Sequence, residues 1–298
     1  MSICIYIYAI IGGFLMFILL ELDKKFIRNN TKDSEYYSSL RIATLVSLII
    51  WVVCAYQKNN FIENVPIFQL FKDYSKLLHN KEGLELGGPS TFFYPSGIYT
   101  APKKLDNVIF AENTLWNNTK NNSDYIINGK TIPGKVYISD VVDMSIIKDK
   151  TYDFVFASHI LEHLVNPLKG LSEITRVLKD DGLCILILPW KEATFDHKRP
   201  ISQFSKLLEN YNNNRDEKNI DDYLPEIKKF YDLSRDKPAG TMEQFLERCK
   251  KQYENRGLHV HVFDFELIIK CLDFSNYKII DTQLVQPCHQ IVVGQKRT

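Results

Sequence analysis

Apolar positions in the middle of the chain alternate between short continuous runs and a helical repeat. Residues 152–157 and 183–188 are mostly apolar, which is typical of strands buried in a parallel sheet. Between these runs, apolar residues recur every three or four positions and predict an amphipathic helix. We expect residues 180–182, Asp-Asp-Gly, to end that helix and open the next strand. Strand, helix and parallel strand form the right-handed crossover unit of doubly wound sheets.

Ligands of doubly wound sheets bind at the carboxyl ends of the strands. Ser158, His159, Glu162 and His163 follow directly after one predicted strand, so we expect them near a ligand. The other predicted elements are a helical lead-in at 61–80, a strand that ends in a tight glycine turn over 84–90, a strand at 136–138, a surface loop at 113–134, a charged helical insertion at 201–256, a helix at 263–274, and closing strands at 277–285 and 289–293.

The first 60 residues have a different pattern. Residues 3–20 form an uncharged apolar run long enough to cross a bilayer, and 42–56 form a shorter one. Five Lys and Arg residues lie between 24 and 41, which favours a cytosolic connector. We therefore predict a membrane-anchor region at 1–60. One span followed by an interfacial helix would keep the catalytic domain cytoplasmic, whereas two full spans would place it on the far side.

The net charge and the cysteine spacing exclude some classes of function. The formal net charge of +1 provides no basic field, so we expect no nucleic-acid partner. The six cysteines are scattered without CxxC spacing, which indicates free thiols rather than a disulfide framework or a zinc site. Nothing in the sequence indicates an oligomeric state.

The stretch from 152 to 189 resembles class I S-adenosylmethionine-dependent methyltransferases. In that family a strand beginning YDxV precedes LEH, a helix ending RVLK, a glycine, and a strand ending near proline. Here these pieces lie at 152–155, 161–163, 176–179 and Gly182. More closely, the set LELGGPS, YDFVFASHILEH, NPL, FDHKRP and RGLHVHVFD is similar to a small-molecule methyltransferase-like subfamily. The resemblance covers roughly 82–298 and implies a Rossmann-like, doubly wound α/β fold with a seven-stranded, mostly parallel sheet. With the helical lead-in, we predict a methyltransferase domain at 61–298, interrupted by the insertion. The resemblance also implies S-adenosylmethionine as cofactor.

The segment from Glu85 to Pro89 stands where the family has its acidic-x-Gly-x-Gly loop. The resemblance implies that the amino-acid part of the cofactor lies against Gly87 and Gly88, where no side chain intervenes. Glu85 would orient the loop or meet the ligand's ammonium group. Pro89 departs from the family pattern because it fixes φ and removes an N–H donor.

Several acids are candidates for the nucleoside part of the cofactor. The family's ribose-binding acid ends the second strand, where Asp106 and Glu112 both stay open. An acid near Asp143 would meet the adenine amino group, although Asp140 and Asp143 would equally suit a turn or helix cap. Ser158 and His159 complete the predicted cofactor-binding set.

The run from His159 to His163 also matches the H-x-x-E-H pattern of zinc hydrolases. On one helix the two imidazoles would share a face and bind zinc. The segment follows directly after a predicted buried strand, however, and zinc would leave the glycine turn unexplained. We therefore predict no metal and keep zinc hydrolysis as an alternative.

Histidines supply the candidate catalytic groups because imidazole titrates near neutrality. His197, His259 and His163 lie in segments expected at the cleft, and we predict that one acts as general base. The insertion is expected to form a lid, with Arg235, Asp236 and Arg256 as polar groups for the acceptor. The sequence thus predicts a membrane-anchored methyltransferase acting on a small-molecule, glycan or lipid-linked acceptor. A non-catalytic, membrane-tethered interaction module is the alternative that the altered glycine turn favours.

Overall fold

The computed structural model describes residues 73–298 except 114–117 and 286. The chain divides into two compact units, Met1–Gln69 and Leu70–Thr298, and the described residues belong to the second. The predicted anchor region at 1–60 lies outside them, so its topology stays a prediction. Within the described ranges, no helix is both long and apolar enough to cross a membrane.

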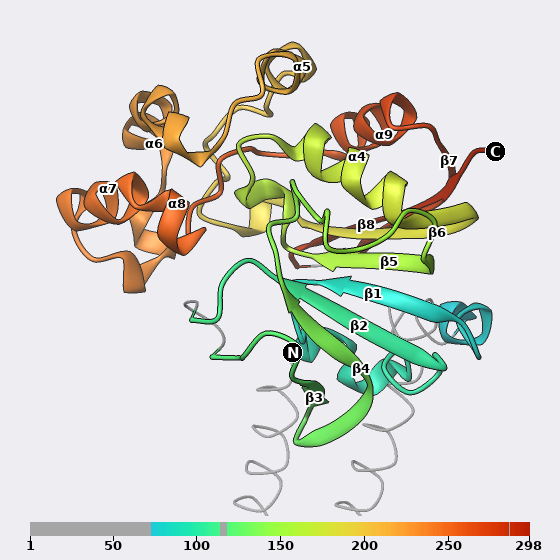
Figure 1. The fold of residues 1–298 in the computed structure, drawn as a ribbon. Helices are drawn as coiled ribbons and strands as arrows, with labels where there is room; N and C mark the ends of the chain where they lie inside the picture. The colour runs from blue at the N-terminus through green and yellow to red at the C-terminus, as the bar shows by residue number, and fades with distance from the viewer. Residues whose placement is uncertain (1–72, 114–117, 286) are drawn as a thin grey trace, which may run out of the picture. The chain divides into compact units, whose positions relative to one another are not determined.

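One mixed sheet of eight strands forms the centre of this unit (Figure 1). The strand order is β3-β4-β2-β1-β5-β6-β8-β7. The central strands β4, β2, β1, β5 and β6 are parallel, and β3, β8 and β7 run antiparallel to their neighbours. The bounds are β1 (Glu82–Leu86), β2 (Lys104–Ile109), β3 (Asp124–Ile127), β4 (Lys130–Ile138), β5 (Tyr152–Ser158), β6 (Leu178–Pro189), β7 (Tyr277–Val285) and β8 (His289–Lys296).

Helices α4 (Pro167–Val177) and α9 (Phe265–Phe274) lie together on one face of the sheet (Figure 1). In α4, Leu168, Leu171 and Ile174 are fully buried. Each such side chain contributes roughly 1.5–3 kcal/mol through removal of apolar surface from water. The amphipathic repeat of the sequence therefore becomes the covering layer of the sheet.

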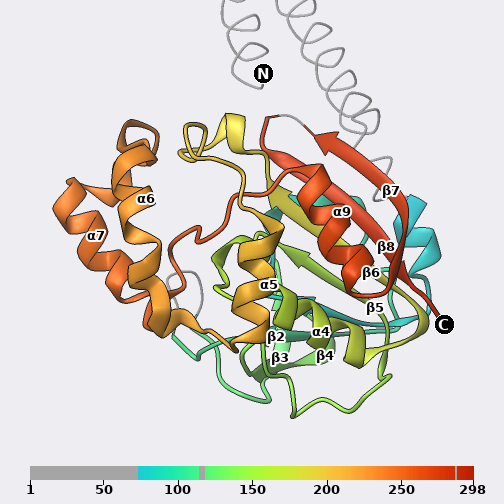
Figure 2. The same ribbon diagram turned by 90° about the horizontal axis from the view of Figure 1, so that it is seen from above.

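The predicted helical insertion is present and has an apolar core that is separate from the main core of the sheet. It comprises α5 (Phe204–Asn212), α6 (Leu224–Phe230), α7 (Met242–Lys250) and α8 (Gln252–Asn255). Helices α6 and α7 lie to one side of the sheet (Figure 2). Their apolar core includes Val165 and Leu258, which lie outside the insertion, so the insertion packs on the domain through a shared core.

The prediction of a surface loop at 113–134 is wrong in its second half, where the chain forms β3 and the start of β4. Tyr125 and Ile127 are buried while Ile126 is exposed, the alternation of a half-buried strand. Asn128 and Gly129 both have positive φ, at 50° and 72°, and turn the chain into β4. Asn-Gly between apolar residues is the strongest short hairpin signal. The sheet consequently has eight strands rather than seven.

The amphipathic helix expected between the apolar runs 152–157 and 183–188 is shorter than predicted. Asn166 caps α4, its side-chain oxygen accepting a hydrogen bond from the N–H of Lys169 at 3.1 Å. The preceding residues, Leu161–His163, form only a 3-10 turn. At the other end β6 begins at Leu178, before the Asp-Asp-Gly segment that we expected to separate helix from strand.

The cysteines in the described part of the chain are free thiols, as expected. Cys184 in β6, Cys249 in α7 and Cys271 in α9 are buried, and Cys288 is partly exposed. Burial raises the pKa of Cys184 and Cys271 to about 12. These thiols are therefore apolar packing groups in the folded state.

Candidate functional site

A cavity of about 340 Å³ opens at the carboxyl ends of the parallel strands. Its walls come from the segments that follow β1, β2, β4 and β5, and from Arg256 at the end of the insertion. The lining residues are Gly87, Gly88, Pro89, Ser90, Val108, Ile109, Phe110, Asp140, Val141, Ser158, His159, Ile160, His163, Leu164 and Arg256. The cavity lies where ligands of doubly wound sheets bind.

The turn after β1 needs both of its glycines. Gly87 and Gly88 have φ of 76° and 70°, a region that side chains rarely adopt. A Cβ on Gly88 would lie 2.2 Å from Oε1 of Glu85, and one on Gly87 would lie 2.4 Å from Cδ1 of Ile160. The turn therefore presents backbone without side chains to the cavity. Pro89, which departs from the family pattern, also lines the cavity.

Glu85 lies beneath this turn rather than in the cavity wall. It is 1% exposed and accepts hydrogen bonds from the hydroxyls of Tyr99, at 2.8 Å, and Tyr125. Burial raises the pKa of Glu85 to about 8, although these hydrogen bonds lower it in part. Of the two roles proposed from the sequence, the geometry favours orientation of the loop.

The acid nearest the cavity is Asp140, in the segment after β4. Asp143 is outside the lining and instead accepts a hydrogen bond from the N–H of Ser145 at 3.2 Å. Asp106 is buried and bound by the hydroxyl of Tyr152 at 2.8 Å, and Glu112 is exposed. The end of β2 thus lines the cavity with Val108, Ile109 and Phe110 and contributes no carboxylate there.

Arg256 connects the insertion to this acid. Its guanidinium forms ion pairs with Asp140 in the segment after β4 and with Glu217 in the insertion. It also lies over the ring of Phe110, with 5.6 Å between the guanidinium carbon and the ring centroid. Arg256 was a predicted acceptor-binding residue; Arg235 and Asp236 lie outside the lining.

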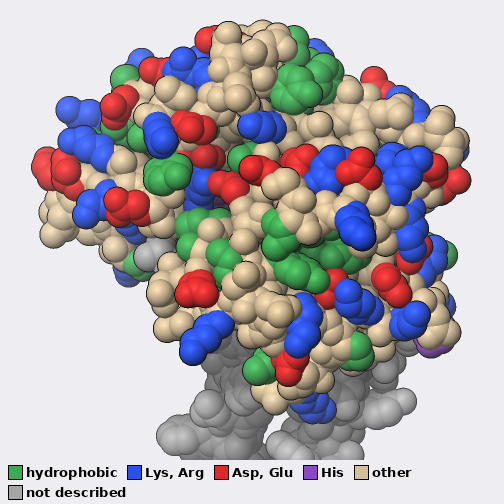
Figure 3. All heavy atoms as spheres, viewed as in Figure 1, with side chains coloured by type: hydrophobic (Ala, Val, Ile, Leu, Met, Phe, Trp, Pro, Cys, Tyr) green, Lys and Arg blue, Asp and Glu red, His purple; other side chains and the backbone are tan. Residues whose placement is uncertain are grey.

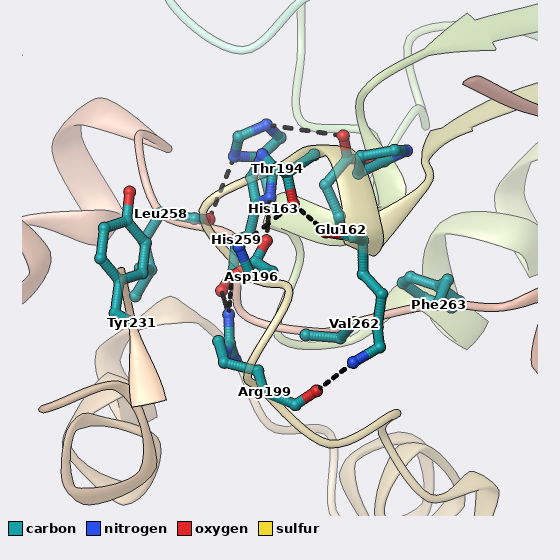
Figure 4. Close-up of polar contacts among 12 residues, drawn as sticks. Glu162, His163, Thr194, Asp196, Arg199, Tyr231, Leu258, His259, Val262 and Phe263 are labelled. Atoms are coloured by element: carbon teal, nitrogen blue, oxygen red, sulfur yellow. Dashed lines mark hydrogen bonds and ion pairs between the residues drawn. The ribbon is translucent and has the colours of Figure 1, made fainter. Parts of the chain in front are cut away.

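The segment from His159 to His163 carries a buried carboxylate between imidazoles (Figure 4). Glu162 is 0% exposed, with Oε1 lying 3.3 Å from Nδ1 of His159 and 3.9 Å from Nε2 of His163. Nδ1 of His163 lies 3.0 Å from the carbonyl oxygen of Leu258. Burial lowers the pKa of His163 to about 4, so this ring is neutral at pH 7.

His259 stacks edge-on behind His163, with 4.8 Å between ring centroids. Its Nδ1 lies 2.6 Å from Oδ2 of Asp196, which in turn binds the buried guanidinium of Arg199 at 2.9 Å. Burial lowers the pKa of His259, but the Asp196 carboxylate outweighs burial and the net pKa is raised. Arg199 also donates to the carbonyls of His259, at 2.7 Å, and Val260, at 3.0 Å.

The three predicted catalytic histidines therefore differ in position. His163 lines the cavity, His259 lies behind it, and His197 bonds Asp232 at 2.7 Å outside the lining. The α-helix that an H-x-x-E-H zinc site needs is absent from this segment, because residues 161–163 form a 3-10 turn. Sequence reasoning missed Asp196 and Arg199, although both lie in the quoted segment FDHKRP.

Comparison with known proteins gives one family. Residues 115–186 match the model of the methyltransferase domain family. No curated protein matches the chain. Among solved structures, a methyltransferase from Methanosarcina mazei is 14% identical, with a TM-score of 0.42, and covers 78% of this chain and 97% of that one.

A second solved structure is the 1,6-didemethyltoxoflavin-N1-methyltransferase of Burkholderia thailandensis, bound to 1,6-didemethyltoxoflavin and S-adenosylhomocysteine. It is 10% identical, has a TM-score of 0.43, and covers 91% of this chain and 92% of that one. The matched segment contains β5, α4 and the start of β6 up to Leu186. These elements include most of the sequence motifs on which the resemblance was based. Residues 115–186, 72 of the 298 residues of the chain, are thus similar to the methyltransferase domain family.

Proposed function

We propose that this enzyme transfers the methyl group of S-adenosylmethionine to a small-molecule acceptor bound beside His163. One observation carries the proposal: a single cavity joins the bare glycine turn to the imidazole of His163. When bound, the cofactor supplies a methyl group on a sulfonium, which is already activated for transfer. The protein's task is to align donor and acceptor and to exclude water.

The donor is assigned to the glycine turn and the acid after β4. Gly87 and Gly88 would receive its amino-acid part, and Asp140 offers carboxylate oxygens to an amino or hydroxyl donor. Val108, Ile109 and Phe110 provide apolar surface for the nucleoside. We keep Ser158 and His159 among the proposed cofactor-binding residues because both line the cavity. We propose Asp140 in place of Asp143, which lies outside the lining.

The acceptor is assigned to the part of the cavity bounded by His163 and Arg256. A neutral imidazole in the wall is the form that accepts a proton from a hydroxyl or amine during transfer. His259, held by Asp196, would position the ring of His163 from behind. Acidic and basic side chains are interspersed over the face seen in Figure 3, with no field of one sign to attract a polyanion.

Membrane anchoring through residues 1–60 is a separate part of the proposal. It rests on the apolar run at 3–20 and would present a glycan or lipid-linked acceptor to a cytoplasmic catalytic domain. Extraction of membranes at alkaline pH tests it, because an anchored chain stays in the pellet and a peripheral chain is released.

Isothermal titration of the full-length protein with S-adenosylmethionine tests donor binding. We expect one site per chain, with competition by S-adenosylhomocysteine. A folded sample that binds neither compound would contradict the proposal and favour the non-catalytic interaction module.

A further inference from the structure

We propose that Glu162, His163 and His259 form a binding site for a divalent transition-metal ion next to the cavity. Glu162 and His163 belong to the turn after β5, and His259 comes from the segment before α9. Each side chain offers one ligand atom, and these atoms all lie within 4.8 Å of one another. Figure 4 shows Glu162, His163 and His259 gathered at one point of the fold.

The carboxylate of Glu162 is the strongest argument. It is 0% exposed, and neither oxygen accepts a hydrogen bond of good geometry. Its ion-pair neighbours among the described residues are His159 and His163, with no Lys or Arg in range. A buried carboxylate is costly unless a cation or hydrogen-bond donors compensate its charge. A metal ion would supply that charge.

Both imidazoles are held in the way that metal-binding histidines usually are. Nδ1 of His163 lies 3.0 Å from the carbonyl oxygen of Leu258, and Nδ1 of His259 lies 2.6 Å from Asp196. Metal ligands almost always donate their second ring N–H to a carbonyl or carboxylate, which fixes ring orientation and leaves the other nitrogen for the ion. Arg199 fixes Asp196 in turn.

The ligand set and spacing suit zinc or a neighbouring first-row ion. Two imidazoles and one carboxylate bind such ions, whereas Mg²⁺ and Ca²⁺ prefer sets made of oxygen. Bonds of about 2.1 Å in a tetrahedron place ligand atoms ~3.4 Å apart. Nε2 of His163 and Oε1 of Glu162 are 3.9 Å apart, and all three ligand atoms lie within 4.8 Å, so side-chain shifts of about 1 Å would close the site.

The site borders the cavity through His163, and three protein ligands leave a fourth position on the ion. This deepens the proposed function and rests on it: with an ion bound, His163 would be a ligand, and the ion would lower the pKa of an acceptor hydroxyl at its fourth position. The role of His163 as a free base then applies to the metal-free protein. Metal binding itself does not depend on methyl transfer. A protein that binds metal but no S-adenosylmethionine would contradict only the proposed function.

The test uses the full-length, untagged protein, so that no added histidine tract binds metal. We expect mass spectrometry to find about one zinc per chain after equilibration with equimolar Zn²⁺ and removal of excess. We also expect Co²⁺ to give visible absorption typical of a tetrahedral site, and Zn²⁺ to raise the melting temperature. These measurements need no variant.

Variants then assign the ligands. Glu162→Gln and His259→Asn should each lose stoichiometric Zn²⁺ binding, and Asp196→Asn should weaken it about 10–100-fold as an outer-shell change. His197→Asn is the matched control, because it removes a histidine outside the cluster and should leave Zn²⁺ binding unchanged. Absence of Zn²⁺ and Co²⁺ binding in the wild-type protein would overturn the proposal and leave imidazolium as the counter-ion of Glu162. Equal Zn²⁺ binding by wild type and Glu162→Gln would overturn it as well.

Discussion

The two ends of the cavity differ in the groups that form them: backbone and apolar side chains at one end, imidazoles and buried charged residues at the other. At the end that we propose for the donor (the donor end), Gly87 and Gly88 present backbone and Val108 to Phe110 present apolar surface. At the end that we propose for the acceptor (the acceptor end), Glu162, Asp196 and Arg199 are buried charged residues next to the imidazoles of His163 and His259. The donor end is local, since each of its parts follows the strand that positions it. The acceptor end joins segments that lie far apart in the sequence.

This difference predicts different responses to substitution. Adding a single Cβ atom should disturb the backbone turn of the donor end. In the acceptor end, removal of one charged partner should destabilise the fold, because the other charge stays buried without compensation. The changes below test whether the two ends behave in these two ways, beginning with the largest expected effect.

Arg199→Met should destabilise the fold by about 3–5 kcal/mol, because it leaves Asp196 buried without its guanidinium. Urea unfolding measures the change. Arg297→Met is the matched control, since Arg297 pairs with Asp273 at the surface and its loss should be small. Equal losses in both variants would show that the acceptor end does not depend on buried charge.

Arg256→Lys should loosen the insertion, because an ammonium cannot bridge Asp140 and Glu217 as the guanidinium does. A hydrogen bond to a charged group contributes about 1.5–3 kcal/mol. Limited proteolysis should then cut within the insertion, residues 201–256, several-fold faster, with cleavage of the sheet region unchanged. Unaltered cleavage would mean that the apolar core of the insertion suffices to hold it.

Gly88→Ala should weaken S-adenosylmethionine binding and destabilise the chain by about 1–3 kcal/mol, because alanine is strained at φ of 70° and its Cβ meets Glu85. Gly129→Ala carries comparable strain at φ of 72° in the β3–β4 hairpin, with nothing within 4 Å of the added Cβ. This control should lose stability but retain donor affinity by titration. If both variants bind the donor normally, the glycine turn is not the donor site.

Acid should destabilise the protein through His261, which bonds the carbonyl of Val165 at 3.1 Å. Burial lowers the pKa of His261 to about 4, below the unfolded value of about 6.5. As pH falls through this window the unfolded chain binds a proton that the folded chain excludes, so stability falls. Thermal unfolding should show His261→Asn losing roughly 2 kcal/mol less than wild type between pH 7 and pH 5. Parallel pH profiles would contradict this.

His197→Asn should have the smallest effect, with turnover unchanged once an acceptor is known. His197 bonds Asp232 outside the cavity lining. His163→Asn, in the cavity wall, should abolish turnover and retain donor binding. A larger loss in His197→Asn than in His163→Asn would return the sequence-based assignment of His197 as base.

The elements around the cavity could largely be predicted from the sequence, and the contacts between its distant segments could not. Apolar runs and a helical repeat located β5, α4 and β6 because neighbouring residues determine those elements. The contact of His163 with His259 depends on how distant segments pack, which no local pattern encodes. The Asn128–Gly129 turn was a readable signal, but polar composition around it favoured a loop.

The buried thiols can report how readily each part of the fold opens to solvent. Cys184, Cys249 and Cys271 lie in the sheet, the insertion and the covering helix, and none is accessible in the folded state. An alkylating reagent can reach each sulfur only when the surrounding element opens. The labelling rate at each position therefore reports the opening free energy of that layer. Comparison of the three rates would show whether the insertion opens separately from the sheet that supports it.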